Sequence, residues 1–275
     1  MDWWQHIPQH MNPVLFSIGS YQMRYYGLMY ILAFITVYAL ISYRLKHENF
    51  SFNIETIQSF MVWAIVGVMA GGRLGYVLFY DLQYFIHNPL QIVMPVNLAT
   101  GKFTGISGMS YHGGVIGVVV SVFFFCKRYH ISFDELSRLV VPVVPLGYTF
   151  GRLGNFINGE LYGRVTSVPW GMYFPMDMTH QLRHPSQLYE AFFEGIVLFL
   201  VLWFLRKNAY FKNYLLGIYL IGYGTVRFFI EFVREPDAQL GFIIGFLTMG
   251  QILCVVMVVA GAGLILLKRY VTKHE

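Results

Sequence analysis

Seven long apolar runs constrain the fold of this chain more than any other feature of its sequence. They cover residues 26–43, 57–80, 113–126, 136–150, 188–205, 215–233 and 243–267. A helix needs roughly 20 apolar residues to cross a bilayer core, and only helices or closed barrels satisfy their backbone hydrogen bonds there. We therefore expect an all-α membrane protein with about seven transmembrane helices. The third and fourth runs are the shortest, and Pro142 and Pro145 predict a kink in the fourth.

The composition supports a membrane protein and excludes several other classes. Hydrophobic residues make up 56% of the 275 residues and charged residues only 12%, whereas a soluble domain carries about 25% charged residues. A chain of this size could not hide so much apolar surface in a soluble core. This excludes an ordinary soluble enzyme, a disordered protein and a nucleic-acid-binding protein. Cys126 and Cys254 lie in apolar runs without disulfide or metal spacing, so we expect no metal and no cofactor.

The basic residues predict the orientation of the helices. Eleven of the nineteen fall in connections at one face: Arg44, Lys46, Lys127, Arg128, Arg138, Arg206, Lys207, Lys212, Lys268, Arg269 and Lys273. Seven fall at the other face, and Arg73 lies inside a run. Because positive residues favour the cytoplasmic side, we expect an outside N-terminus and a cytoplasmic C-terminus.

The long connections fall on the predicted outer face. We treat residues 1–275 as a single polytopic membrane domain. Residues 1–25 are rich in aromatics and contain prolines, which indicates an interfacial segment on the outer face. Residues 81–111 and 152–186 are rich in Gly, Pro, Asn and Ser, which predicts outer-face loops with short elements.

Polar residues that are costly in a membrane gather at the predicted outer face. They are Tyr26, His112, Arg152, Asn155, Arg227 and Glu231, with Arg73 in the outer half of the second run. An arginine at the centre of a bilayer costs about 2.5–3.5 kcal/mol even on a lenient scale, so each is a functional candidate. Structural alternatives remain for several. Tyr26 and His112 are also compatible with ordinary interfacial residues, Arg227 and Glu231 with an i,i+4 ion pair, and Arg73 with snorkelling or helix packing.

Residues 151–164, GRLGNFINGELYGR, are harder to explain by packing. They hold two Arg, two Asn, one Glu and four Gly at the end of a predicted helix. Glycine lets a backbone approach a ligand closely, and arginine recognises phosphate in a bidentate manner. Arginines that hold a leaving phosphate and a histidine that accepts a proton predict transfer at a phospholipid headgroup.

The chain resembles the prolipoprotein diacylglyceryl transferase family, and residues 151–164 match the signature of that family. Further matches, in the order of the family, are RYYGLMY at 24–30, GRLGY at 72–76, YHGG at 111–114, HPSQLYE at 184–190 and RFFIEF at 227–232. The family has seven spanning helices and an outside N-terminus. It is found in the bacterial cytoplasmic membrane, with its active site toward the outer leaflet.

The resemblance implies a reaction and a set of site residues. The family transfers the diacylglyceryl group of phosphatidylglycerol to the lipobox cysteine of a preprolipoprotein, which forms a thioether and releases glycerol phosphate. This is the first step of bacterial lipoprotein maturation. The essential histidine of the family falls on His112, and its other functional residues fall on Tyr26, Arg152, Asn155, Glu160, Gly163, Arg227 and Glu231.

The residues themselves suggest how such a reaction would proceed. The nucleophile belongs to the substrate, so the chain needs no reactive cysteine of its own. We hypothesise that His112 accepts the thiol proton, that Arg152 and Arg227 hold the phosphate, and that Glu231 orients Arg227. In an alternative, the arginines lower the pKa of the thiol directly.

Two other classes of protein compete with this interpretation. Gly105-Ile106-Ser107-Gly108 is similar to the serine motif of rhomboid-type intramembrane proteases. No later spanning run carries a histidine partner, although a serine nucleophile needs a base within hydrogen-bond reach. A transporter also carries intramembrane charges, but here the charges gather at one face and not at the midplane.

Overall fold

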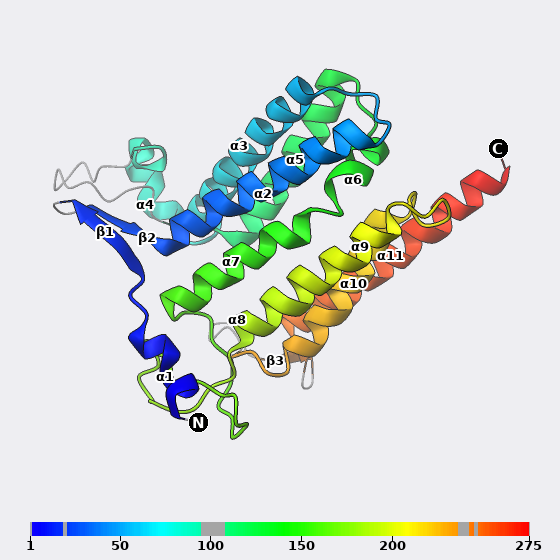
Figure 1. The fold of residues 1–275 in the computed structure, drawn as a ribbon. Coiled ribbons are helices and arrows are strands. Elements are labelled where there is room, and N and C mark those ends of the chain that lie inside the picture. The colour runs from blue at the N-terminus through cyan, green and yellow to red at the C-terminus, as the bar shows by residue number, and fades with distance from the viewer. Residues whose placement is uncertain (1, 19–20, 95–107, 236–241, 245–246, 275) are drawn as a thin grey trace. The chain divides into compact units, whose positions relative to one another are not determined.

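The computed structural model describes residues 2–18, 21–94, 108–235, 242–244 and 247–274, and these residues are mostly helical (Figure 1). The helices are α1 (Asp2–His10), α2 (Tyr25–His47), α3 (Ile54–Phe79), α4 (Leu82–His87), the 3-10 helix η1 (Pro89–Ile92), α5 (Tyr111–Tyr129), α6 (Phe133–Val140), α7 (Val144–Asn158), α8 (Ser186–Tyr189), the π-helix η2 (Glu190–Val197), α9 (Leu198–Leu205), α10 (Leu215–Ile230) and α11 (Met249–His274). The described strands form two short antiparallel hairpins, β1 (Val14–Ile18) with β2 (Tyr21–Arg24) and β3 (Phe242–Ile244) with β4 (Leu247–Thr248).

Four helical stretches among the described residues are long and apolar enough to cross a membrane. They are α2, α3, the continuous stretch Ser186–Leu205 formed by α8, η2 and α9, and α11. They correspond to the first, second, fifth and seventh apolar runs. The helix of the sixth run, α10, is apolar but has only 16 residues. The helical membrane class is therefore supported, and the number of seven spans stays a prediction.

The fourth apolar run is interrupted, which confirms the predicted kink. Helix α6 ends at Val140 and α7 begins at Val144, with Pro142 in the gap and Pro145 in the first turn of α7. Proline lacks the backbone N–H that a continuing helix requires. The buried Arg44 covers the end of α6, since its Nη1 donates to the carbonyl oxygens of Arg138 and Leu139 at 2.8 and 2.6 Å.

One predicted boundary is wrong. The expected outer-face loop begins at residue 152, but α7 continues to Asn158, so Arg152 and Asn155 are helical residues. The helix ends at Gly159, which adopts a φ of 69° that favours glycine. Gly151 and Gly154 lie inside the helix and do not break it. Gly154 instead allows close packing, because a Cβ there would lie 3.0 Å from the ring of Tyr26 on α2.

Residues 45–136 form one compact unit, in which α3 and α5 pack along a seam of small residues. The facing residues are Gly67, Gly71 and Gly75 on α3 and Gly113, Gly117 and Ser121 on α5. A Cβ on Gly117 would lie 2.1 Å from the carbonyl oxygen of Gly67. Small residues of this kind let two backbones meet directly in a membrane.

Residues 1–44 and 137–275 form the second unit, which holds α2, α7, α10, α11 and the stretch from α8 to α9. Helices α10 and α11 lie side by side, and η2 packs against α7. Gly195 of η2 makes this second contact possible, because a Cβ there would lie 2.0 Å from the Thr149 Oγ1 atom. The close approach of η2 to α7 positions the charged groups described below.

The N-terminal helix α1 docks on the connection between α7 and α8. The Gln5 carbonyl accepts a hydrogen bond from the Tyr173 N–H at 2.8 Å, and the Trp4 Nε1–H donates to the Trp170 carbonyl at 3.2 Å. His6 stacks on Tyr173 with ring centroids 4.9 Å apart. A small core joins Phe156 of α7 to Met172 and Phe174 of this connection.

Candidate active site

Buried charges from α7, η2 and α10 meet inside the second unit. Arg152 of α7 and Arg227 of α10 both contact the carboxylate of Glu190 in η2, at 2.7 and 3.0 Å. The Glu190 side chain is fully buried, whereas the Arg152 and Arg227 side chains keep 14% and 12% of their surface exposed. The two arginines proposed from the sequence are therefore brought together by a shared carboxylate.

Arg152 also links the polar residues of the 151–164 segment. Its Nη1 donates to Asn155 Oδ1 at 3.3 Å, and Asn155 Nδ2 donates to Glu160 Oε1 at 2.9 Å. Asn158 Nδ2 donates to the same Glu160 oxygen at 3.2 Å. Arg152, Asn155 and Glu160 thus form one connected chain of hydrogen bonds.

Arg227 pairs with Glu231, the residue that follows the end of α10, at 3.1 Å between Nη2 and Oε2. Glu231 is also held from β4, where the Thr248 hydroxyl donates to its Oε1 at 3.2 Å. Contacts with both α10 and β4 hold the Glu231 carboxylate in place, so that it faces Arg227. This contact agrees with the hypothesis that Glu231 orients Arg227.

Three members of the cluster, Glu190, Glu194 and Tyr148, are absent from the site predicted from the sequence. The Tyr148 hydroxyl accepts a hydrogen bond from Arg152 Nε at 2.6 Å and donates to Glu194 Oε2 at 2.5 Å. Glu194 is buried and also lies 3.7 Å from Arg227. Both glutamates belong to η2, and π-helical turns are frequent at functional sites.

Tyr26 and Gly163 lie at the edge of the cluster. The ring of Tyr26 packs against Gly154, and its hydroxyl lies 3.1 Å from that of Tyr30. The Gly163 N–H donates to the His184 carbonyl at 2.8 Å, and a Cβ on Gly163 would lie 2.3 Å from the Val233 carbonyl oxygen. Gly163 therefore allows two connections to approach closely.

His112 belongs to the first turn of α5, in the unit of residues 45–136. Its side chain lies outside the described part of the structure, so its role as a proton acceptor stays a prediction. Ser110 caps the start of α5: its Oγ accepts a hydrogen bond from Gly113 N at 3.2 Å, and its N–H donates to the Gly72 carbonyl at 2.8 Å.

Arg73 binds backbone carbonyl groups of η1 and of Gly108, which precedes α5. Its guanidinium donates to the carbonyl oxygens of Ile92, Gln91 and Gly108 at 2.8, 2.6 and 3.2 Å. The same guanidinium lies over the Phe85 ring, 4.9 Å from its centroid. These contacts favour the packing role that the sequence left open for Arg73.

A second charged group lies in the connection between α7 and α8. Arg183 pairs with Asp177 through two hydrogen bonds of 2.7 and 3.0 Å and with Glu235 at 3.0 Å. Burial raises the pKa of the Asp177 carboxyl, but hydrogen bonds from Arg183 and Thr179 lower this pKa by more. The pKa of Asp177 therefore lies well below its ordinary value.

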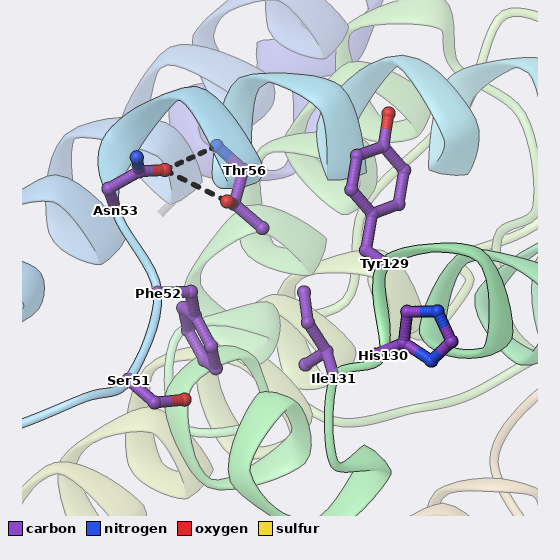
Figure 2. Close-up of a pocket in the computed structure, with 7 residues that line it drawn as sticks. All are labelled: Ser51, Phe52, Asn53, Thr56, Tyr129, His130 and Ile131. Atoms are coloured by element: carbon purple, nitrogen blue, oxygen red, sulfur yellow. Dashed lines mark hydrogen bonds between the residues drawn. The ribbon is translucent and has the colours of Figure 1, made fainter.

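A recess in the 45–136 unit contains none of the predicted site residues. Figure 2 shows its lining residues, Ser51, Phe52, Asn53, Thr56, Tyr129, His130 and Ile131. Asn53 caps α3 there by accepting hydrogen bonds from the N–H and hydroxyl of Thr56.

Within the described ranges, no three His, Cys, Asp or Glu side chains gather as metal ligands would. Residues 105–107 of the serine-protease motif lie outside the described residues.

The apolar helices and the buried cluster define a multi-pass helical membrane protein with an arginine–carboxylate site. Residues 13–267 match the prolipoprotein diacylglyceryl transferase family, and the chain belongs to that family.

Individual relatives support the same assignment. A Chlorobaculum tepidum protein named phosphatidylglycerol–prolipoprotein diacylglyceryl transferase is 55% identical over 265 residues, which cover 96% of this chain and 92% of the relative. Proteins of the same name from Wolinella succinogenes and Legionella pneumophila are 45% and 43% identical; the alignments cover 93% and 94% of this chain and 93% and 98% of those proteins.

Proposed function

We propose that this chain transfers the diacylglyceryl group of phosphatidylglycerol to the lipobox cysteine of a preprolipoprotein. The family membership supports the reaction. One observation assigns this function to particular residues: Arg152 and Arg227 converge on Glu190, and each arginine side chain stays partly exposed. Two convergent arginines suit a phosphate group, because a guanidinium offers several N–H donors in a fixed plane.

The setting of the reaction is part of the proposal. Residues 1–275 form a polytopic domain of about seven spans in the bacterial cytoplasmic membrane, with the N-terminus outside and the C-terminus in the cytoplasm. The cluster then lies toward the outer leaflet, where it can meet phosphatidylglycerol and the lipobox of a translocated precursor.

The chemical step is a displacement at carbon. The cysteine sulfur forms a bond to the terminal glyceryl carbon of the diacylglyceryl group, and the bond from that carbon to the phosphate oxygen breaks. Glycerol phosphate leaves with the electron pair, and the thiol proton passes to a base. Arg152 and Arg227 stabilise the charge that develops on the leaving phosphate.

His112 is the proposed base for the thiol proton. A free thiol has a pKa of about 8.5, so only a few per cent is thiolate at neutral pH, and the pKa of histidine suits proton transfer in this range. A His112→Asn variant should lose most of its turnover at neutral pH. Near-normal turnover of that variant at neutral pH would contradict this role and show that the arginines activate the thiol, because raised pH alone ionises the thiol without a base.

The remaining assigned residues support the arginines. Asn155 and Glu160 hold Arg152 through the hydrogen bonds described above, Glu231 orients Arg227, and Tyr26 and Gly163 shape the edge of the site. If Arg152→Ala and Arg227→Ala both bind phosphatidylglycerol and turn over normally, the phosphate role is wrong.

A direct assay tests the whole proposal. The purified protein is incubated with phosphatidylglycerol and a lipobox peptide, and the peptide is examined for the added diacylglyceryl mass. A peptide in which serine replaces the cysteine should gain nothing. Absence of the mass gain on the cysteine peptide, with folded protein, would overturn the proposal.

A further inference from the structure

One buried carboxylate oxygen is shared by both candidate phosphate-binding arginines. Glu190 Oε2 lies 2.7 Å from Arg152 Nε and 3.0 Å from Arg227 Nη1, and Glu190 Oε1 lies 4.0 Å from Arg234 Nη1. Glu190 is fully buried, and it reaches the arginines from η2, whereas they extend from α7 and α10. A phosphate that binds these arginines therefore shares their N–H groups with a carboxylate that the fold holds in place.

The charges around the arginines are closely balanced. Arg152, Arg227 and Arg234 face three carboxylates. These are Glu190, Glu194 and Glu231, of which Glu194 and Glu231 lie 3.7 and 3.1 Å from Arg227. A buried ion cluster of this kind tolerates little uncompensated charge, so an arriving anion must compete with the resident carboxylates.

The ion pairs also leave hydrogen-bonding capacity unused. Among the described residues, Arg227 Nη1 and Glu190 Oε1 are buried without a hydrogen-bond partner, although Arg227 Nη1 lies 3.0 Å from Glu190 Oε2. Charge attraction therefore holds this pair without a well-aligned hydrogen bond. A phosphate oxygen with better alignment could take over the Nη1–H donor, because charge-assisted hydrogen bonds are the strong ones.

Substrate and product differ in charge in a way that makes this competition useful. The phosphodiester of phosphatidylglycerol carries one negative charge, whereas a phosphate monoester carries about 1.5 to 2 near neutral pH. Two arginines without a counter-charge would hold the released glycerol phosphate more strongly than the lipid. A fixed carboxylate between them weakens the binding of the more highly charged product most.

We propose that Glu190 is a positioning residue that sets the spacing of Arg152 and Arg227 and competes with bound phosphate, so that glycerol phosphate leaves after each transfer. This inference rests on the proposed function and assigns a role in product release to a residue of the same site.

The test compares wild type with Glu190→Gln, which keeps the shape of the side chain but removes its charge. We expect glycerol phosphate to inhibit Glu190→Gln about tenfold more strongly than wild type, because one competing charged acceptor is lost. We expect kcat to fall and KM for phosphatidylglycerol to fall or stay the same. A purely structural role would instead raise KM and weaken inhibition by glycerol phosphate, and that result would overturn the proposal.

Two further variants keep the test decisive. Glu190→Asp retains the charge but withdraws the carboxylate by one methylene, so inhibition should strengthen less than in Glu190→Gln; it replaces that variant if Glu190→Gln does not fold. Glu55→Gln makes the same change at an exposed position in the first turn of α3 and should leave inhibition unchanged.

The failure of this inference is distinguishable from failure of the proposed function. Direct binding of glycerol phosphate is measured in parallel as a shift in thermal unfolding. A wild-type protein that binds glycerol phosphate but transfers no diacylglyceryl group would contradict the proposed function. Equal affinity of wild type and Glu190→Gln, with active wild type, would contradict only the role of Glu190.

Discussion

At the scale of single residues, Asp177 determines how the connection between α7 and α8 responds to acid. It accepts hydrogen bonds from Arg183 and Thr179, and its pKa lies below the ordinary value. A depressed pKa means that the contact contributes its full stabilisation above the unfolded pKa of about 3.9. That stabilisation is lost as the pH falls through the lower pKa of the folded state.

This predicts an acid-sensitive connection whose sensitivity depends on Asp177. Asp177→Asn should lower stability near neutral pH and flatten its pH dependence below about pH 4, because no carboxylate remains to titrate. Limited proteolysis across a pH series measures the effect. A wild-type pH profile identical to that of Asp177→Asn would contradict the prediction.

Arg73 is a second residue whose contacts make a measurable prediction. Arg73→Ala loses three hydrogen bonds to carbonyl groups, and a hydrogen bond to a charged group contributes about 1.5–3 kcal/mol. We expect thermal destabilisation and a lower kcat with little change in KM for phosphatidylglycerol. Arg73→Lys should rescue little, because one ammonium cannot reproduce the planar guanidinium contacts. A raised KM with unchanged kcat would instead indicate that Arg73 binds lipid.

The sequence predicts some members of the charged cluster and misses others, depending on where they lie in the apolar runs. Arg152, Asn155, Arg227 and Glu231 stand out because they lie near the ends of apolar runs, and Glu160 follows from the resemblance to the family. Glu190 and Glu194 lie inside the run 188–205, where hydropathy averaging hides two acids among apolar neighbours. Two signals were available: Glu190 ends the motif at 184–190, and it lies four residues before Glu194. Acids at membrane depth need cationic partners. Which arginines they meet depends on how η2, α7 and α10 pack.

At the scale of the elements, the seam between α3 and α5 depends on backbone contact. Gly117→Ala would place a Cβ 2.1 Å from the Gly67 carbonyl oxygen, and overpacking of this kind typically costs about 1–3 kcal/mol. Gly114→Ala is the matched control in the same helix, because its Cβ would find only ordinary contacts, 3.6 Å or more from Val68. In thermal unfolding in detergent, Gly117→Ala should melt at a lower temperature than Gly114→Ala. Equal melting temperatures would contradict the prediction that backbone contact at Gly117 stabilises the packing of α3 on α5.

Helix ends are less predictable than helix cores in this chain. The proline pair correctly predicted the interruption between α6 and α7. The glycines of 151–159 instead suggested an early loop, because their packing role depends on α2, which a local pattern does not reveal. The π-helical turn of η2 is not predicted by the local sequence either, and its Gly195 lies against Thr149 of α7, a contact between elements distant in the sequence.

At the scale of the whole molecule, the predicted orientation can be tested by labelling. In a background with Cys126→Ser and Cys254→Ala, Met178→Cys provides a residue that is 90% exposed in the connection between α7 and α8, and Lys273→Cys provides one near the C-terminus. A membrane-impermeant maleimide applied to intact spheroplasts should label position 178 only. Labelling of position 273 only would invert the orientation derived from the basic residues.

The docking of α1 also has a consequence for biogenesis. Trp4 and Gln5 bind the backbone of Trp170 and Pro169, residues 166 and 164 positions later in the chain. At a synthesis rate of about 5–20 residues per second, α1 waits roughly 8–30 s before its partner exists. During that time α1 lacks these two contacts. The N-terminal segment therefore reaches its final place only after residues 169 and 170 have been made, although it is the first part of the chain to be synthesised.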